Sequence, residues 1–137
     1  MIALDTNVVS EAMKPAPNAT VLVWINEQVA GTLFLSTVTL AELLFGVGAL
    51  PKGRRKDQLA AAVDDVITMF RGRLLPFDTE AVRHYASLAV MARNAGHGFP
   101  MADGYIAAIA ASRGFVVASR DTAPYSGAKV RVINPLV

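Results

Sequence analysis

Residues 1–7 of the chain read MIALDTN, a short apolar run that ends at a carboxylate. The run Ile2–Leu4 predicts a buried strand that starts almost at the first residue, with Asp5 at its carboxyl end. Asp5 could cap the helix expected next, which stabilises a helix by about 1 kcal/mol. It could instead hold a ligand that needs negative charge. This stretch alone leaves both alternatives open.

Strand-like and helical segments alternate along the rest of the chain. The further strands are expected at 33–36, 74–77, 115–118 and 130–133, and the helices at 8–13, 19–29, 38–47, 54–70, 79–95 and 100–113. Such alternation predicts an α/β fold with a parallel, doubly wound sheet of about five strands. A length of 137 residues is that of one compact domain, so we expect a single domain over residues 1–137.

The composition excludes several classes of protein. Apolar residues make up 53% of the chain and the mean hydropathy is +0.40, which suits a sheet covered on both faces. No apolar stretch reaches the length of a membrane span, so no membrane association is expected. The absence of cysteine excludes disulfides and thiolate metal sites. Asp5 and the lack of early basic residues argue against a secretory signal, so the expected location is the cytoplasm.

Four carboxylates lie close to the ends of predicted strands or the starts of the following helices: Asp5, Glu42, Asp103 and Asp121. Each has an ordinary structural explanation. Asp5 could be a helix cap, and Glu42 could complete a capping box with Thr39. Asp103 near a helix start could interact favourably with the helix dipole, and Asp121 could stabilise a turn through a side-chain hydrogen bond. In a doubly wound sheet, however, ligands bind beyond the carboxyl ends of the strands, where several of these acids would converge.

Convergence of the acids would call for cations. Two carboxylates about 5 Å apart repel by about 3 kcal/mol at an effective dielectric near 20, so four in one pocket need protons or metal ions. An oxygen-only donor set favours Mg²⁺ or Mn²⁺ over zinc. Such ions activate water and neutralise charge on a phosphoryl oxygen. The residues therefore suggest a metal site for phosphodiester hydrolysis.

The distribution of charge is compatible with a polyphosphate substrate. The net charge is only +2, but four acids in one pocket would leave seven acids against thirteen basic residues elsewhere, a net charge of +6. A basic exterior gives sequence-independent affinity for nucleic acid. The only basic cluster is Lys52, Arg54, Arg55 and Lys56. It could contact RNA or simply be the solvated start of the helix predicted at 54–70.

Four stretches in order resemble the PIN domain, and most of all VapC-type toxins of the FitB-like branch. They are IALDTN at 2–7, STVTLAEL at 36–43, ADGYIAA at 102–108 and ASRD at 118–121, accompanied by GRR at 53–55 and NP at 134–135. The resemblance implies a three-layer α/β/α sandwich and a Mg²⁺- or Mn²⁺-dependent ribonuclease. It also implies the toxin role of a type II toxin–antitoxin system, a cognate antitoxin, a homodimer and larger toxin–antitoxin assemblies.

The resemblance also implies roles for individual residues. Asp5, Glu42 and Asp103 match the family's acidic ligands, with Asp121 as the fourth, and Thr6, Asn7 and Ser119 match supporting polar positions. Many members read Thr-Arg-Asn after the fourth strand, with another acid three positions beyond the Asn. Here the stretch is Ser119-Arg120-Asp121 and the later position is Pro124, so the carboxylate occupies the Asn position.

Three other functions remain open from the residues. A haloacid-dehalogenase-type phosphatase also has an Asp after its first strand, but it needs a second Asp two residues later, where this chain has Asn7. A DNA nuclease would use the same acidic cluster on another substrate. A non-catalytic protein-binding module would use the four acids only as caps and turns.

Overall fold

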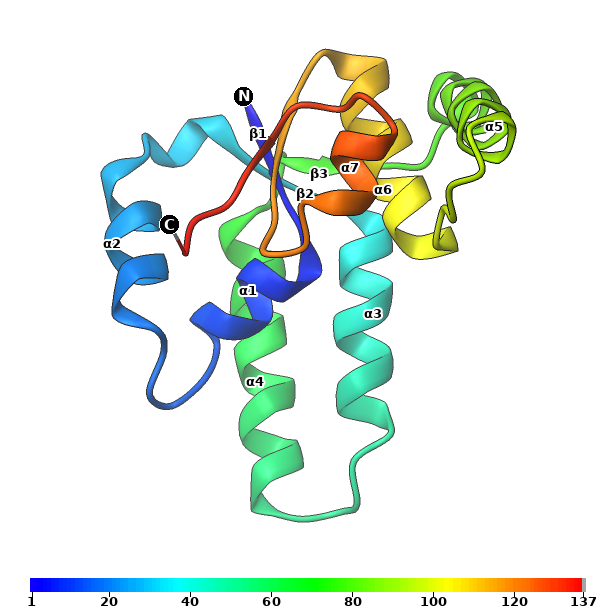
Figure 1. Cartoon of the computed structure of the whole chain (residues 1–137). Helices are drawn as coiled ribbons and strands as arrows, with labels where there is room; N and C mark the ends of the chain where they lie inside the picture. The colour runs from blue at the N-terminus through cyan, green and yellow to red at the C-terminus, as the bar shows by residue number, and fades with distance from the viewer. Residues whose placement is uncertain (137) are drawn as a thin grey trace.

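The computed structural model describes residues 1–136, and it contains a five-stranded parallel sheet between two layers of helices (Figure 1). The strands are β1 (Ile2–Leu4), β2 (Leu33–Ser36), β3 (Leu74–Leu75), β4 (Val116–Ala118) and β5 (Val132–Ile133). Their order is β3-β2-β1-β4-β5, and every neighbouring pair is parallel. The predicted three-layer α/β/α sandwich is thus confirmed. Val137, the last residue of the predicted domain, lies outside the described residues.

All six predicted helices are present, with ends that differ by at most a few residues. The helices are α1 (Thr6–Ala12), α2 (Ala19–Glu27), a 3₁₀ turn (Ala30–Thr32), α3 (Thr37–Gly48), α4 (Arg54–Met69), α5 (Thr79–Asn94), α6 (Met101–Arg113) and α7 (Ala123–Gly127). The 3₁₀ turn and α7 were not predicted.

Three strand predictions were too long. The third strand ends at Leu75, directly before Pro76, which has no N–H to donate to a ladder. The fourth strand begins at Val116, one residue after its predicted start. The last strand begins only at Val132, because the N–H of Val130 donates to the carbonyl of Tyr125 and closes the turn after α7 instead.

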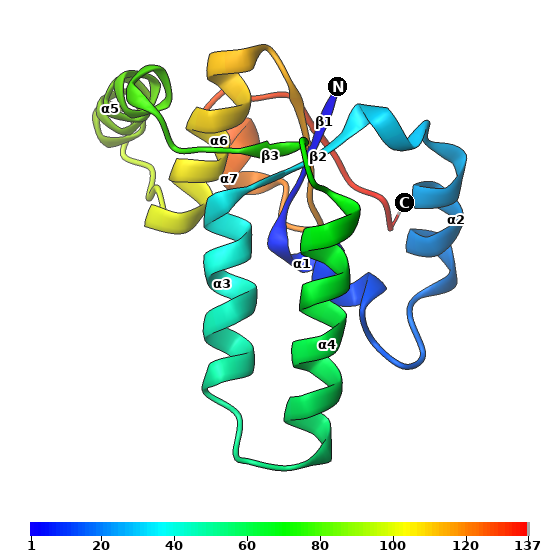
Figure 2. The ribbon, with the colours of Figure 1, turned by 180° about the vertical axis from the view of Figure 1, so that it is seen from behind.

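Alternate residues of each strand enter different cores, as the pleat of a strand requires. Ala3 and Val117 pack in the layer that holds α5, α6 and α7, and Leu4 and Leu35 pack in the layer that holds α1 to α4. The view from behind shows the two helical layers on opposite sides of the strands (Figure 2). Both faces of the sheet are therefore covered, which explains the near-continuous apolar strands.

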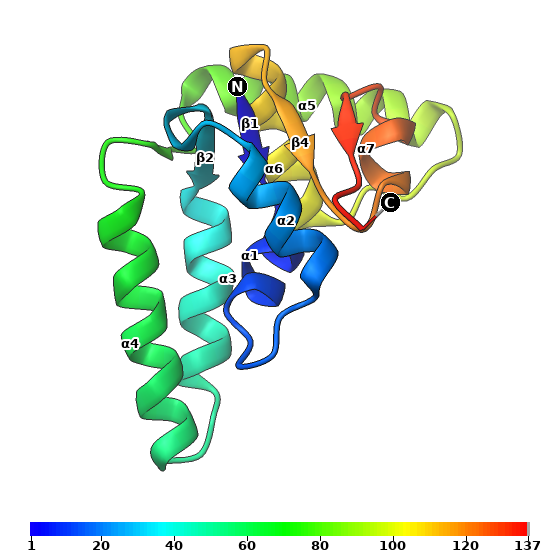
Figure 3. The same ribbon diagram turned by 90° about the vertical axis from the view of Figure 1, so that its left-hand side faces the viewer.

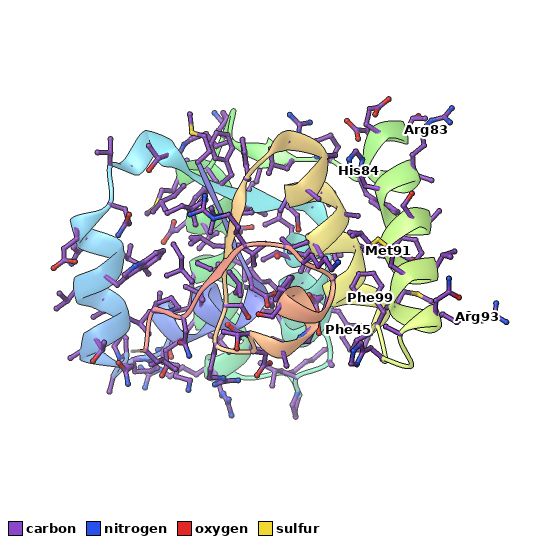
Figure 4. The ribbon with its side chains drawn as sticks, turned by 45° about the horizontal axis from the view of Figure 1, so that its top comes forward. Phe45, Arg83, His84, Met91, Arg93 and Phe99 are labelled. Carbon is purple, nitrogen blue, oxygen red and sulfur yellow. The ribbon has the colours of Figure 1, made fainter. Side chains whose placement is uncertain are left out.

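Two features outside the sheet affect what the surfaces can bind. Helices α3 and α4 run side by side as a long pair that extends beyond the edge of the sheet (Figure 3). On the other side, α5 packs on α6, and its Arg83 and Arg93 point outward, away from the sheet (Figure 4). Within residues 1–136, no helix combines the length and apolar character needed to cross a membrane.

The strand order defines where a ligand site can form. The chain continues from β1 to β2 on one side, and β4 pairs with β1 on the other, so the topological switch point lies between β1 and β4. Leu4 is level with Leu35 of β2 and with Ala118 of β4. The residues that follow them, Asp5, Ser36 and Ser119, therefore lie together at the carboxyl edge of the sheet.

The packing of α5 on α6 generates a stability prediction at Gly104. A Cβ at this buried residue would lie 3.0 Å from ring atoms of both Phe99 and Tyr85, whose stacked rings restrict each other's movement. We expect Gly104→Ala to lower the free energy of unfolding by about 1 kcal/mol, since overpacking exceeds the gain in helix propensity. Urea unfolding of Gly104→Ala and Gly46→Ala measures this.

Gly46→Ala is the matched control, because Gly46 is also inside a helix and no atom lies within 4 Å of its added Cβ. Its free energy of unfolding should rise by up to about 1 kcal/mol. Equal stability of the two variants would contradict tight α5–α6 packing at Gly104.

Candidate active site

Asp5 is a buried carboxylate at the end of β1, with only 3% of its surface exposed. It caps α1, because its Oδ1 accepts a hydrogen bond of 2.7 Å from the N–H of Thr6. Its Oδ2 accepts from the hydroxyls of Ser119 at 2.7 Å and Tyr125 at 2.8 Å, and from the amide of Asn7 at 3.5 Å. Asp5 is thus a cap and also a charge held in one orientation by three separate segments.

Asn7 and Ser119 connect α1 to the loop after β4. The side-chain amide of Asn7 donates to Ser119 Oγ at 3.1 Å, and its carbonyl oxygen accepts from the N–H of Arg120 at 3.1 Å. Ser119 Oγ also accepts from the N–H of Asp121 at 3.0 Å. These bonds fix the backbone of the loop that carries Asp121 after β4, while the Asp121 side chain itself is exposed.

Glu42 reaches the same region from α3. Its Oε1 accepts a hydrogen bond of 2.6 Å from the hydroxyl of Thr6. The suggested capping box between Thr39 and Glu42 is wrong, because α3 begins two residues earlier, and Ser36 is its cap, accepting from the N–H of Thr39 at 3.0 Å. Thr39 is fully buried, and its hydroxyl lies 3.3 Å from both the Ser36 and the Thr6 hydroxyls. Glu42 therefore has no capping role.

Asp103 lies in the first turn of α6, within electrostatic range of the other three acids. Its pKa is raised from 3.8 to about 6 by partial burial and then by the negative charges of Asp5, Glu42 and Asp121. No lysine or arginine in residues 1–136 forms an ion pair with any of the four carboxylates. The structure thus brings all four predicted acids within electrostatic reach, without a basic side chain to neutralise them.

The acids do not form a ready-made metal cage. In the described part of the chain, no three His, Cys, Asp or Glu side chains stand in an arrangement that could enclose an ion. Glu42 is engaged by Thr6, and the Oδ2 of Asp5 accepts three hydrogen bonds. The charge of the cluster and its oxygen donors fit Mg²⁺ or Mn²⁺, and the side chains would adjust around the ion.

Tyr125, in α7, is a part of this site that the sequence did not reveal. The residue is fully buried, and burial together with the charge of Asp5 raises the pKa of its hydroxyl far above its usual value. The hydroxyl therefore stays protonated and donates permanently to Asp5. The one signal in the sequence was Pro124, at a position where proline favours the start of a helix.

The predicted basic cluster lies apart from the acids, at the start of α4. Lys52, Arg54 and Arg55 are exposed, whereas the Nζ of Lys56 donates to the carbonyl of Gly48 at 3.2 Å and so holds the α3–α4 turn. Of these four residues, only Arg55 lines a hollow that also contains Glu42.

A parallel α/β sandwich with an acidic cluster at its switch point is an architecture of metal-dependent hydrolases. The PIN-domain profile matches residues 2–129, and the chain belongs to the PIN-domain family.

Its relatives include the VapC ribonuclease Y4jK of Sinorhizobium fredii, 47% identical over 98% of this chain and 97% of that protein. The toxin FitB of Neisseria gonorrhoeae is 40% identical over 98% of both chains. The crystal structure of FitAcB from Neisseria gonorrhoeae superposes with a TM-score of 0.94 at 40% identity, covering 99% of each chain.

The raised pKa of Asp103 generates a prediction about stability. The folded carboxyl binds its proton more tightly than the unfolded chain does, so its contribution to stability falls as the pH rises from 3.8 through about 6. In excess chelator, Asp103→Asn should therefore melt at a higher temperature than the wild type at pH 8. Below pH 3.8 the difference should vanish.

Asp64→Asn, on the exposed face of α4, controls for the change in net charge. A melting temperature of Asp103→Asn equal to or below that of wild type at pH 8 would contradict the destabilisation of the ionised Asp103 by burial and by the neighbouring acids.

Proposed function

We propose that this chain is a single PIN domain, residues 1–137, that acts as a Mg²⁺- or Mn²⁺-dependent endoribonuclease and as the toxin of a type II toxin–antitoxin system. The observation that carries the proposal is the group of four acids without a basic partner at the switch point, seen most clearly in the raised pKa of Asp103. The names of the similar proteins, a VapC ribonuclease and a toxin, support the choice of RNA and of the toxin role.

Each acid has a distinct place in the proposed mechanism. Asp5, Glu42, Asp103 and Asp121 would hold the metal ion, which supplies an activated water and neutralises charge on the phosphoryl oxygen. Asp5 is held in one orientation by its hydrogen-bond donors. Glu42 and Asp121 are exposed and can face the substrate, so their carboxylates orient the attacking water. No protein nucleophile takes part.

The phosphatase alternative fits the geometry poorly. Such an enzyme needs a carboxylic acid two residues after the nucleophilic Asp, but Asn7 stands there. Its amide donates to Ser119, and its carbonyl oxygen accepts from Arg120, so it serves as a link between segments. An amide also cannot deliver a proton to a leaving group.

The proposed partners fit apolar hollows of the surface. A hollow of about 500 Å³ between α1, α2 and α4 is lined by apolar side chains such as Leu22, Ile25 and Met69, and it suits a segment of an antitoxin. A second hollow of about 620 Å³ beside Glu42 is bordered by Phe45 and Met101, which are 78% and 63% exposed. A second copy of the chain would cover these side chains in a homodimer. RNA as substrate makes the cytoplasm the expected location.

The first functional prediction concerns the acids. Asp5→Asn and Asp103→Asn should each lower RNA cleavage by at least about a hundredfold, because they remove charge on which the metal depends, while the proteins stay folded by circular dichroism. The exposed Asp64→Asn should cleave like wild type. Full activity of Asp103→Asn, or of wild type in excess chelator, would contradict the proposal.

Expression of the protein in a bacterium, followed by sequencing of RNA ends, would identify the substrate. Wild type should arrest growth and produce new RNA ends that are absent with Asp103→Asn, and sequencing of those ends gives the cut site. Purified protein offered DNA and RNA oligomers in parallel separates a ribonuclease from a DNA nuclease. A non-catalytic binding module predicts no Mg²⁺ affinity by calorimetry and no new ends.

The second functional prediction concerns Tyr125. Tyr125→Phe removes one of the hydroxyls that hold Asp5, and loss of such an outer hydrogen bond typically lowers metal affinity or activity by about 10–100-fold. We expect weaker Mg²⁺ binding by calorimetry, and a lower kcat with little change in KM. Tyr85→Phe, in the aromatic cluster beside α6, is the matched control and should change neither Mg²⁺ binding nor kcat.

A further inference from the structure

A groove leads away from the acidic cluster between α1, α3 and α4. Its first part has a volume of about 260 Å³ and is lined at one end by Thr6 and Glu42 of the proposed active site. A second hollow of about 210 Å³ continues it along α1 and α4. The two parts share five lining residues, Ser10, Met13, Lys14, Arg55 and Leu59. They form one groove that starts at the site.

Besides the acid Glu42, the groove lining carries two basic side chains on a mostly apolar surface. Lys14 projects from the end of α1 and Arg55 from the first turn of α4, and both line both parts of the groove. The walls include Leu43, Val47 and Leu59, which offer apolar contact to ribose and bases. Lys52 and Arg54 line neither part, so the groove distinguishes Arg55 from its basic neighbours.

Both basic side chains are available to a ligand. Arg55 is exposed and forms no ion pair within residues 1–136. Lys14 is paired with Glu11 at 2.7 Å, and its side chain is 59% exposed, whereas that of Glu11 is 20% exposed and the paired oxygen Oε2 is buried. The ammonium group of Lys14 has three N–H donors, so it can contact a phosphate while it keeps Glu11 as a partner.

The groove differs in chemistry from the larger apolar hollow between α1, α2 and α4. The one charged residue among the described lining of that hollow is Arg73, and its guanidinium already donates to the carbonyls of Ala30, Leu33 and Met69. That surface fits a protein segment. The groove with Lys14 and Arg55 instead combines two exposed basic side chains with direct access to the acidic cluster.

We infer that this groove binds the single-stranded RNA that flanks the cleaved bond, with Lys14 and Arg55 each contacting a backbone phosphate. The inference rests on the proposed ribonuclease function and adds the path of the substrate. Positive charge here also offsets the repulsion between Glu42 and the incoming phosphates. The contacts are to the backbone, so they strengthen binding without selecting a sequence.

The test measures binding rather than cleavage. A fluorescein-labelled RNA of about 12 nucleotides is titrated with Asp103→Asn protein, and anisotropy is followed between about 50 and 200 mM salt. Adding Lys14→Gln and Arg55→Gln should weaken binding on the order of tenfold at low salt. It should also make the slope of log K against log salt shallower by about 1.4, or about 0.7 for each lost phosphate contact.

Two control proteins accompany the groove variant. Arg83→Gln with Arg93→Gln removes the same charge from the outer side of α5, away from the sheet (Figure 4), and should leave the slope unchanged. Lys14→Arg with Arg55→Lys keeps the charge and should retain most of the affinity. An RNA of about three nucleotides, too short to occupy both the site and the whole groove, should lose less affinity than the longer one.

The outcomes separate this inference from the function on which it rests. If wild type cleaves RNA but the groove variant and the α5 control bind RNA equally well, the inferred RNA path is wrong. The groove would then be a candidate binding site for a protein segment instead. If wild type neither cleaves nor binds RNA, the proposed function falls and the inference falls with it. A shallower slope for the groove variant alone supports both.

Discussion

The burial of one carboxylate constrains much of this structure. Asp5 is almost fully enclosed, and a buried charge is tolerated only when hydrogen bonds replace the water that it has lost. Its donors come from the first turn of α1, from the residue after β4 and from α7. The short α7 is therefore more than a connection to the last strand, because without it the Oδ2 of Asp5 would lose one of its three donors. The same bonds fix the carboxyl ends of β1 and β4, where the proposed site lies.

The sheet then supplies what Asp5 alone cannot. Parallel strands place their carboxyl ends at one edge, and the helices that start there bring Glu42 and Asp103 towards Asp5. Partial burial and the charges of the other acids both destabilise the ionised form of Asp103 in the folded protein, as its raised pKa shows. A protein selected for stability alone would not maintain this arrangement, and a site that uses the repulsion to attract a cation gives it a physical reason.

Much of the fold could be predicted from the sequence, because its strands are apolar runs and its long helices are amphipathic. The residues alone left Asp5 open between a cap and a ligand, and the structure shows that one oxygen caps α1 while the charge of Asp5 acts on Asp103 in the acidic cluster. Helix α7 escaped prediction because five residues that include Ser and Gly carry no helical period. Tyr125 was missed with it, since its contact with Asp5 spans 120 residues of chain.

The proposed binding surfaces share a wall. Met13, at the end of α1, lines the apolar hollow as well as both parts of the groove. A protein segment seated in the apolar hollow would therefore press on the same side chain that borders the RNA path. An antitoxin seated in the apolar hollow would thus contact a wall of the proposed RNA path without entering the acidic cluster. Helix α1 and the two residues that follow it thus join Asp5, which caps the helix at one end, to Met13 and Lys14 at the other end, where the two proposed binding surfaces meet.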